Sequence, residues 1–365
     1  MSIKCGIVGL PNVGKSSLFN ALSNAGAEAA NFPFCTIDPN VGIVPVPDER
    51  LEKLNELVQP EQKQPTAIEF VDIAGLVKGA SEGKGKGNAF LSHIREVDLI
   101  VHMVRCFEDD DVIHVEGGVD PIRDIQIIES ELIFKDLESV EKREEKLRKQ
   151  AKSGDKSIQA KIDQVIKLKE HLEEGNPARS FPANGHSDAW EDLMLLSAKD
   201  VLYVCNVDEG DLPYGVDNPH AQKVAQHAAK EGTEHVVVCA KIEAEIAELD
   251  DEEKASFLGD LGLEKSGLDR LIQAAYHKLG LITFYTAGPK EVRAWAIPEG
   301  FKAPQAAGTI HTDFERGFIR AETIKFDDYV SCGSESAARD KGKMRSEGRD
   351  YEVKDGDVLL FRFNV

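Results

Sequence analysis

The chain has 365 residues, 41% of them hydrophobic, and its 44 basic and 65 acidic residues give a formal charge of −21. This length allows one large hydrophobic core with one or two smaller domains beside it, so two or three domains are expected. The negative charge excludes indiscriminate binding to phosphate backbones; any RNA contact needs a local basic patch, and no DNA partner is expected.

The composition also argues against membrane and disulfide classes. No segment reaches the roughly 18 consecutive apolar residues of a membrane helix, and the first residues read as a strand instead of a signal peptide. The six cysteines form no CxxC pair and have no zinc-finger spacing, which favours neither a disulfide framework nor a structural metal. We therefore expect a cytoplasmic protein without a membrane partner.

The first part of the chain alternates strand and helix patterns. Residues 4–8 predict a buried strand, and residues 15–22 the start of a helix after a glycine-rich loop. Further strand-like runs lie at 41–44, 67–71, 99–104, 201–204 and 236–239. Most intervals between them suit crossover helices, so we predict an α/β fold with a doubly wound, mostly parallel sheet.

One interval does not fit this alternation. Residues 125–174 are rich in Glu, Lys, Gln and Leu, with apolar residues at helical spacing and an interruption at 153–155. This pattern predicts two long helices folded into an antiparallel hairpin that is inserted into the sheet domain. Either a docking arm or a solvated surface pair fits the sequence equally well.

The chain changes character from about residue 281. Short strand candidates lie at 282–285, 292–297, 308–310, 319–324 and 357–363, with a helix-like stretch at 334–341. These predict a separate, β-grasp-like α+β domain. The predicted boundaries are 1–124 and 196–278 for the two parts of the nucleotide-binding domain, 125–195 for the inserted hairpin and 281–365 for the last domain.

The loop after the first strand carries a phosphate-binding motif. Residues 9–16 match G-x-x-x-x-G-K-[ST], with a strand before them and a helix after them. Glycines let backbone N–H groups surround the β- and γ-phosphates, Lys15 adds positive charge, and Ser16 ligates Mg²⁺. Nucleotide contacts are expected from Asn12, Val13, Gly14, Lys15, Ser16 and Ser17.

Two further segments complete a triphosphate site. Asp72 begins a D-x-x-G motif at the end of a predicted strand, where it would hold the Mg²⁺ shell and Gly75 would approach the γ-phosphate. Thr36 lies between the two motifs, in a loop-like stretch from which it could ligate Mg²⁺ while triphosphate is bound. Four glycines between residues 79 and 87 predict a mobile second switch.

The base-reading motif is altered. GTPases place N-K-x-D where this chain has Asn206-Val207-Asp208-Glu209, and S-A-K where it has residues 239–241, Cys-Ala-Lys. The aspartate of N-K-x-D accepts two guanine N–H donors, which adenine does not offer in that arrangement. Glu209 displaces the carboxylate and Val207 replaces the lysine, so we expect ATP to be preferred over GTP, or else a promiscuous site. Base contacts are expected from Asn206, Val207, Glu209 and Ala240.

In this order, P-N-V-G-K-S, F-P-F-C-T, D-I-A-G-L-V-K-G-A and N-V-D-E make the chain resemble the Obg-related YchF subfamily of translation-factor-class P-loop GTPases. The match covers the whole length. The resemblance implies a coiled-coil insert, a C-terminal TGS domain, hydrolysis of ATP in preference to GTP, and association with the ribosome, through its large subunit.

The resemblance also directs attention to catalysis, because Leu76 stands where Ras-like proteins have a water-orienting glutamine. Leucine cannot orient water, so we consider His102 and His114. His102 lies within an apolar strand and is expected in the core, whereas His114 lies in an acidic loop from which it could swing onto the attacking water. Asn12 stands where potassium-stimulated GTPases ligate K⁺, which makes K⁺ a candidate cofactor.

Three functions remain open at this point. The first is a slow ATPase used as a nucleotide-dependent switch on the ribosome. The second is a regulatory RNA- or protein-binding module that nucleotide stabilises, with incidental hydrolysis. An ordinary GTPase is the variant of the first function in which guanine is preferred. A kinase is the third, although the chain has no recognisable acceptor pocket. For RNA, the candidate contact is the basic stretch 339–349 of the TGS domain, which is also consistent with a solvated loop.

Overall fold

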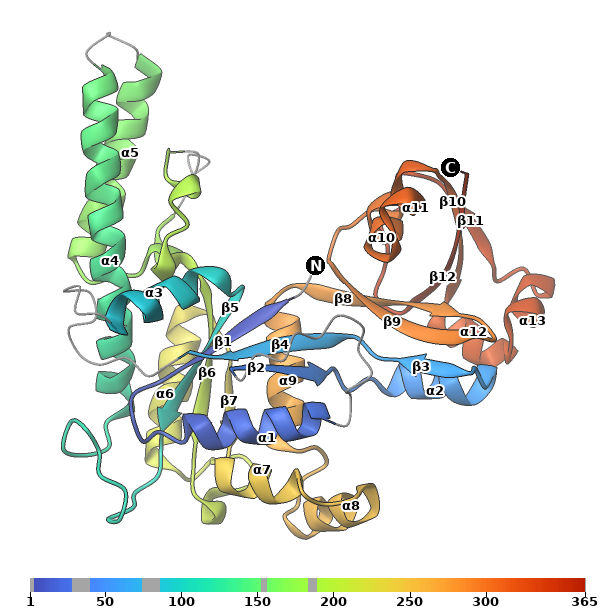
Figure 1. Ribbon diagram of the computed structural model, residues 1–365, viewed down its shortest axis with the longest axis horizontal. Helices are drawn as coiled ribbons and strands as arrows, with labels where there is room; N and C mark the ends of the chain where they lie inside the picture. Colours follow the sequence, from blue (N-terminus) through green and yellow to red (C-terminus); the bar gives the residue numbers. More distant parts are fainter. Residues whose placement is uncertain (1–2, 28–39, 74–85, 152–155, 183–188, 365) are drawn as a thin grey trace. The chain divides into compact units, whose positions relative to one another are not determined.

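The computed structural model describes residues 3–27, 40–73, 86–151, 156–182 and 189–364. The chain divides into two compact units. Residues 3–43 and 69–271 form the large unit, and residues 44–68 and 272–364 form the small unit. Each unit is built mainly around one six-stranded sheet (Figure 1).

The sheet of the large unit has the strand order β2-β4-β1-β5-β6-β7. Its strands are β1 (Lys4–Val8), β2 (Val41–Pro45), β4 (Ala67–Asp72), β5 (Leu99–Arg105), β6 (Asp200–Asn206) and β7 (His235–Val238). β1 pairs in parallel with β4 and β5, and β5–β6 and β6–β7 are also parallel. Every residue of β5 is buried, as expected for a central parallel strand covered on both faces. The predicted α/β sheet is confirmed.

Helices α1 (Lys15–Ala27), α3 (Lys86–Glu96) and α6 (Pro219–Glu231) connect strands of this sheet, and three further helices follow β7: α7 (Ala240–Ile246), α8 (Asp251–Asp260) and α9 (Gly267–Lys278). α1 packs against α7, and α6 packs against β6 and β7. The carboxyl ends of β1, β4, β5 and β6 therefore open onto one edge of the sheet, where α/β proteins bind their ligands.

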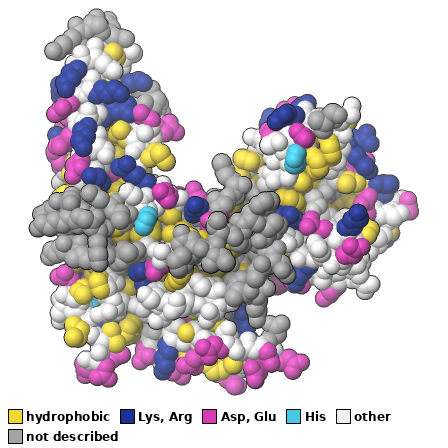
Figure 2. Space-filling model, viewed as in Figure 1, with side chains coloured by type: hydrophobic (Ala, Val, Ile, Leu, Met, Phe, Trp, Pro, Cys, Tyr) yellow, Lys and Arg dark blue, Asp and Glu magenta, His cyan; other side chains and the backbone are white. Residues whose placement is uncertain are grey.

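The inserted hairpin consists of α4 (Pro121–Gln150) and α5 (Lys156–Glu173), which run side by side (Figure 1). Asp120 caps α4 by accepting a hydrogen bond from the Arg123 N–H. The two helices share an apolar seam that includes Val140, Leu147, Ile162, Val165, Leu168 and Leu172. Basic and acidic side chains are mixed on the visible face of the hairpin (Figure 2), and ion pairs such as Lys169–Glu141 at 3.2 Å join them.

Short 3₁₀ helices return the chain from the hairpin to β6. They are η3 (Ala178–Ser180), η5 (Glu191–Leu193) and η6 (Leu196–Ala198). Another 3₁₀ helix, η7 (Glu209–Asp211), follows the end of β6. The hairpin is therefore joined to the strand that carries Asn206.

The small unit has the strand order β11-β10-β12-β8-β9-β3. Its strands are β3 (Gln62–Gln64), β8 (Leu281–Ala287), β9 (Glu291–Pro298), β10 (Phe318–Lys325), β11 (Arg345–Glu347) and β12 (Asp357–Phe363). Its helices are α2 (Glu49–Val58), α10 (Ala303–Ile310), α11 (Thr312–Arg316), α12 (Phe326–Cys332) and α13 (Glu335–Asp340). The mixed sheet with helices is the predicted α+β domain, and α13 occupies the helix-like stretch at 334–341.

Two features of the small unit differ from the sequence prediction. Residues 308–310 end α10 and are not a strand. Ala303, Ala306 and Ala307 are fully buried at helical spacing, which a three-residue window could not reveal. In addition, residues 44–68, placed by sequence in the nucleotide-binding domain, group with the small unit: β3 pairs with β9, and Leu51 and Leu54 enter its core.

The described residues include five of the six cysteines, all free thiols. Four are buried: Cys5, Cys106, Cys205 and Cys239. Buried free cysteines of this kind act as small apolar core residues. Cys35 lies outside the described residues. Over the same described ranges, no helix has both the length and the apolar character to cross a bilayer.

Candidate functional site

The phosphate loop connects the end of β1 to the start of α1. Asn12 and Gly14 have positive φ angles of 63° and 95°. A Cβ atom at Gly14 would collide with the side-chain nitrogen of Asn206, so only glycine fits there. Asn12, in contrast, is one of the few other residue types that tolerate the left-handed region. The local backbone therefore accounts for both residues of the motif.

The charged residues of the phosphate site meet at the carboxyl edge of the sheet. The Lys15 ammonium forms an ion pair with Asp72 at the end of β4. Ser16 and Ser17 are exposed in the first turn of α1, so their hydroxyl groups are open to a ligand. Helix α1 directs its N-terminal dipole to the same place.

A hard divalent cation fits the oxygen donors of this edge. Mg²⁺ prefers hydroxyl, carboxylate and phosphate oxygens, which Ser16, Asp72 and a bound nucleotide would supply. The described residues contain no group of three His, Cys, Asp or Glu side chains arranged for a metal. A phosphate-bridged magnesium ion does not need such a group. Thr36 and Gly75, the other predicted contacts, lie outside the described residues.

Asn206 joins the phosphate loop to the opposite wall of the site. Its side chain is buried at the end of β6; Nδ2 donates to the Val13 carbonyl and Oδ1 accepts from the Ala240 N–H, both at 2.9 Å. Three residues predicted separately from the sequence are thus brought into one hydrogen-bonded unit. One donor and one acceptor of this carboxamide thus join the phosphate loop to the start of α7.

A cavity of about 620 Å³ opens beside this unit. Among its lining residues are six that the sequence predicted to contact nucleotide: Asn12, Gly14, Ser17, Asn206, Val207 and Ala240. The size suits a nucleoside-sized ligand, and the position at the carboxyl ends of parallel strands is the usual one in α/β sheets. This cavity is therefore the candidate base site.

Glu209 lies beside this cavity and does not line it. Its side chain is 56% exposed, and its carboxylate lies 4.0 Å from the ammonium of Lys241. The neighbouring Asp208 does line the cavity, but its carboxylate accepts the Glu209 N–H at 2.9 Å and caps η7. The carboxylate arrangement that reads guanine is therefore not reproduced at the described residues.

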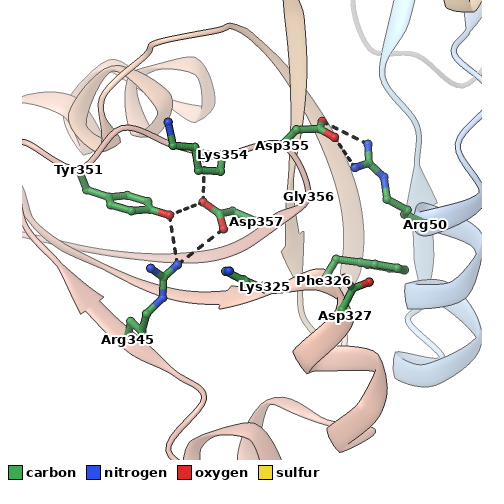
Figure 3. Close-up of a pocket in the computed structure, with 10 residues that line it drawn as sticks. All are labelled: Arg50, Lys325, Phe326, Asp327, Arg345, Tyr351, Lys354, Asp355, Gly356 and Asp357. Carbon is green, nitrogen blue, oxygen red and sulfur yellow. Dashed lines mark hydrogen bonds and ion pairs between the residues drawn. The ribbon is translucent and has the colours of Figure 1, made fainter.

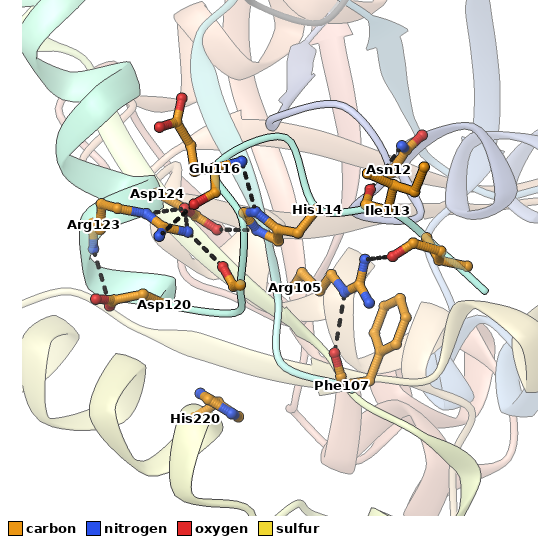
Figure 4. Close-up of polar contacts among 12 residues, drawn as sticks. Asn12, Arg105, Phe107, Ile113, His114, Glu116, Asp120, Arg123, Asp124 and His220 are labelled. Atoms are coloured by element: carbon orange, nitrogen blue, oxygen red, sulfur yellow. Dashed lines mark hydrogen bonds and ion pairs between the residues drawn. The ribbon is translucent and has the colours of Figure 1, made fainter. Parts of the chain in front are cut away.

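The sequence reasoning missed one wall of the cavity. Phe107, Asp109 and Val112 come from the loop after β5. The buried Arg105 organises this loop by donating to the carbonyls of all three residues, at 3.1, 3.1 and 2.8 Å. Figure 4 shows the bond to Phe107. The available signal was positional: residues 99–104 were predicted as a strand of the same sheet, so the loop after them had to open onto the same edge.

The same loop carries His114. Its side chain is only 5% exposed, so the structure holds it away from solvent although it lies in the acidic loop from which it is expected to swing. Nε2 lies 2.9 Å from Oδ2 of Asp124, and Nδ1 accepts the Glu116 N–H at 3.1 Å. A third contact ties the loop to the phosphate site, because Asn12 Nδ2 donates to the Ile113 carbonyl at 3.0 Å (Figure 4).

His102 occupies the core position expected from its apolar strand. It is buried in β5 next to the Tyr203 ring, 5.7 Å away between centroids. Burial lowers its pKa to about 3, so the imidazole is neutral at physiological pH. This confirms its assignment as a core histidine.

The small unit has a cavity of its own, of about 490 Å³ (Figure 3). Four cations line it: Arg50, Lys325, Arg345 and Lys354. Acids in the same wall neutralise much of this charge, since Arg50 donates to Asp355 at 2.5 Å and Arg345 lies 3.9 Å from Asp357. Tyr351 donates to Asp357 at 2.7 Å, and burial raises the Tyr351 pKa to about 12. The charged side chains that line this cavity therefore pair largely with one another.

A second charged cluster lies on the strands of the small unit. Three arginines surround Glu322: Arg362 at 2.8 Å, Arg320 at 3.3 Å and Arg339 at 3.8 Å. The hydrogen bond from Arg362 is the main cause that lowers the pKa of the Glu322 carboxyl. Arg339, which also pairs with Glu335, belongs to the predicted basic stretch; Arg320 and Arg362 are distant in sequence. Cross-strand pairing of β10 with β12 brings them together.

Two family models match the chain. The model MMR_HSR1, described as "50S ribosome-binding GTPase", matches residues 4–158. The model YchF-GTPase_C, described as "Protein of unknown function (DUF933)", matches residues 281–364. The two matches cover the first strand and phosphate loop at one end and the predicted TGS domain at the other.

Full-length relatives are similar over the whole chain. The "Ribosome-binding ATPase YchF" of Bacillus subtilis is 56% identical over 366 residues, and that of Escherichia coli O157:H7 is 54% identical, each with complete coverage of both chains. The solved structure of the Schizosaccharomyces pombe YchF GTPase has a TM-score of 0.89 at 39% identity and covers 99% of this chain and 98% of that one. The chain therefore belongs to the YchF family.

Proposed function

We propose that this protein is a Mg²⁺-dependent P-loop ATPase that hydrolyses ATP to ADP and phosphate, GTP less well, and acts as a nucleotide-dependent switch on the ribosome. The observation that carries the proposal is the cavity next to the phosphate loop, whose two walls Asn206 joins through Val13 and Ala240. The names of the full-length relatives, "Ribosome-binding ATPase YchF", support the same activity.

The preference for adenine rests on the chemistry of the cavity wall. Guanine recognition needs a carboxylate directed at its N1–H and N2–H donors. Glu209 stands beside the cavity near Lys241, and Asp208 uses its carboxylate as a helix cap. The buried Val207 adds an apolar surface where GTPases have a lysine stem. Guanine would leave its donors unpaired there, which binding sites reject strongly.

Restoring the GTPase motif tests this preference. In the double variant Val207→Lys, Glu209→Asp, GDP affinity should rise and ADP affinity fall in calorimetric titrations with Mg²⁺, so that their ratio changes by roughly tenfold or more. Glu248→Asp, an exposed acid in the same unit, is the matched control and should leave the ratio unchanged. Tighter binding of GDP than of ADP by the unmodified protein would contradict the proposal and make it an ordinary GTPase.

We assign the magnesium ligands to Ser16, Thr36 and Asp72, and the γ-phosphate contact to Gly75. Asn12 is the K⁺ ligand in this proposal: its Nδ2 is engaged with Ile113, which leaves its side-chain oxygen for a cation. Turnover should fall on chelation of Mg²⁺ and be higher in potassium than in sodium salts of equal ionic strength. Equal turnover in both salts would remove K⁺ from the proposal.

His114 is proposed as the residue that orients the attacking water, since Leu76 cannot. His114→Ala should then lower turnover by roughly a hundredfold or more with little change in nucleotide affinity. His311→Ala, an exposed histidine of the small unit, is the control. Unchanged turnover in His114→Ala would exclude the role.

A second candidate function has one observation in its favour. Both ring nitrogens of His114 are engaged within the protein, which suits a nucleotide-stabilised RNA- or protein-binding module with incidental hydrolysis. Multiple-turnover phosphate release, in the presence of ribosomes, separates the two. Sustained release supports the ATPase switch, and release of one equivalent or less supports the static module.

For the ribosome contact, we propose that the arginines around Glu322 bind RNA phosphates. We choose the large subunit because the matching family model is described as "50S ribosome-binding GTPase". Guanidinium groups bind phosphate in a bidentate manner, and such contacts weaken with salt. In sedimentation with 50S subunits, Arg320→Ala with Arg362→Ala should weaken binding and flatten its salt dependence. Arg316→Ala, 75% exposed in the same unit, is the control. An unchanged salt slope would exclude this surface.

A further inference from the structure

The loop after β5 has an inverted polarity around His114. Residues Ile113 and Val115 are 78% and 48% exposed, whereas the imidazole side chain between them is only 5% exposed. Burial away from water normally lowers the free energy of apolar side chains, whereas exposing an imidazole to water costs little. This segment therefore holds its three side chains in the reverse of their preferred environments, and other contacts must compensate for that arrangement.

Those contacts come from the first turn of the hairpin helix α4. Asp124 is buried, and its Oδ2 lies 2.9 Å from Nε2 of His114. Because Nδ1 of His114 accepts the Glu116 N–H, Nε2 is the nitrogen that carries the proton and donates to Asp124. With both nitrogens engaged, the imidazole has no site left for a water molecule. Figure 4 shows the ring directed toward Asp124.

Arg123 closes the same arrangement. Its guanidinium donates to Oδ1 of Asp124 at 2.9 Å and to the carbonyls of Glu116 and Gly118 at 3.2 and 2.7 Å. It neutralises the buried carboxylate and fastens the end of the loop to α4. Two consecutive residues of one helix thus hold the side chain and the backbone of the loop at the same time.

The other side of the loop touches the phosphate site. The Ile113 carbonyl accepts from Asn12, a residue of the phosphate loop (Figure 4). The backbone next to His114 is therefore already at the phosphate loop while the imidazole points to α4. The His114 carbonyl accepts the Gly117 N–H at 3.1 Å, so His114 opens a turn, and a local rearrangement of this turn would release the imidazole.

We infer that Asp124 is a positioning residue that holds His114 in a retracted state, and that α4 thereby restrains hydrolysis until the contact opens. This inference rests on the proposed role of His114. A charge-assisted hydrogen bond shifts such an equilibrium by roughly tenfold or more, enough to keep unstimulated turnover low. Any partner that displaces the start of α4 would release the imidazole, which places control of hydrolysis at the foot of the hairpin.

The direction of the effect makes the inference testable in the full-length protein. Asp124→Ala should raise ATP turnover without ribosomes several-fold, while ADP affinity stays at the wild-type value. Asp124→Asn, which keeps the volume and an acceptor but not the charge, should give a smaller increase. Asp120→Ala is the matched control: it removes the cap of α4 four residues earlier, without a contact to His114, and should leave turnover unchanged.

A second measurement reports the contact without using activity. Deuterium exchange at the C2–H of His114, followed by mass spectrometry, should be slow in the wild type and roughly tenfold faster in Asp124→Ala, but not in Asp120→Ala. Unchanged exchange and a turnover that falls or stays constant in both Asp124 variants would overturn the inference. A rise of equal size in Asp120→Ala would assign the effect to fraying of α4, and would overturn it too.

Combining His114→Ala with Asp124→Ala in one protein, and comparing it with each single variant, separates this inference from the proposed role of His114. If His114→Ala removes turnover and abolishes the gain from Asp124→Ala, both stand. If His114→Ala lowers turnover but Asp124→Ala gives no gain, the restraint is wrong and the role of His114 stands. If His114→Ala turns over like the wild type, the proposed role of His114 fails, and with it any control of hydrolysis by Asp124.

Discussion

At the residue scale, single polar side chains connect parts of the site that lie far apart in the sequence. Asn206 spans from the phosphate loop to the start of α7, and Arg105 holds the carbonyl groups of the loop after β5. Each satisfies buried backbone groups that would otherwise lose hydrogen bonds on leaving water. The shape of the cavity therefore depends on side chains that need not touch the nucleotide.

Removing the Asn206 carboxamide tests this dependence. In Asn206→Ala, the Val13 carbonyl and the Ala240 N–H lose their partner, which should cost about 1–3 kcal/mol of stability. ADP affinity, measured by calorimetry, should fall by roughly tenfold or more, because the two walls are no longer joined. Asn20→Ala, at an exposed position of α1, should change neither quantity. Wild-type affinity in Asn206→Ala would contradict the role assigned to this residue.

The buried His102 should make the large unit sensitive to acid. Its pKa is lowered to about 3 in the folded state, so below pH 6.5 the unfolded chain takes up a proton that the folded chain does not. Stability is therefore lost as the pH falls from about 6.5 toward 3. Between pH 7 and pH 5, urea unfolding of the wild type should lose about 2 kcal/mol more than unfolding of His102→Gln.

The exposed His311 provides the comparison for this pH effect. His311→Gln should retain the full loss of stability between pH 7 and pH 5, because it changes an exposed side chain of the small unit and leaves the buried His102 in place. Parallel pH profiles of the wild type and His102→Gln would show that the buried imidazole does not contribute.

At the scale of elements, α4 is attached to the large unit by buried charges as well as by its apolar seam. Asp136 accepts from the N–H groups of Leu196 and Ser197 at 2.8 and 2.7 Å, and from the Ser197 hydroxyl at 2.6 Å. These bonds cap η6, which leads directly into β6. Burial raises the pKa of Asp136 despite them. The hairpin is thus fixed to the strand that ends at Asn206.

Two acids on the same helix should differ greatly in their effect on stability. Asp136→Ala leaves two buried N–H groups without a hydrogen-bond acceptor and should lower the free energy of unfolding by about 3 kcal/mol or more. Glu138→Ala removes only surface pairs with Lys135 and Lys142 and should cost less than about 1 kcal/mol. Chemical denaturation measures both. Equal losses would mean that the bonds of Asp136 contribute no more than surface ion pairs.

At the scale of the whole molecule, each unit has its own hydrophobic core. One core of the small unit is built around Phe284, Phe318 and Phe361, and the cavity proposed for nucleotide is lined only by residues of the large unit. A ligand that binds one folded unit stabilises that unit by mass action. Bound nucleotide should therefore stabilise the large unit more than the small unit.

Calorimetric unfolding should resolve this unevenness. At a hundred times its dissociation constant, Mg-ADP should stabilise the large unit by about 2.7 kcal/mol and raise the midpoint of its transition. The midpoint of the small unit should move little, and Trp295 fluorescence can report it, with Trp190 replaced by Phe. Equal shifts of both transitions would show that the two units unfold as one.

The amino-acid sequence alone determined the local chemistry of this protein. The spacing of Gly9, Gly14, Lys15 and Ser16 requires a strand, a tight loop and a helix start, and the helical periodicity of residues 125–174 identifies the hairpin. These signals are legible because each depends on residues that are close in the chain. The change of pattern at about residue 281 predicted a separate last domain, and the YchF-GTPase_C model matches residues 281–364.

Only the tertiary structure decided which distant groups meet. The pairing of β3 with β9 assigns residues 44–68 to the small unit, and the alanines of α10 show as a helix face only against their sheet. Glu209 lies beside the base cavity, and His114 is turned to Asp124. Such placements depend on long-range packing and on the competition between several hydrogen-bond partners, which no local pattern encodes.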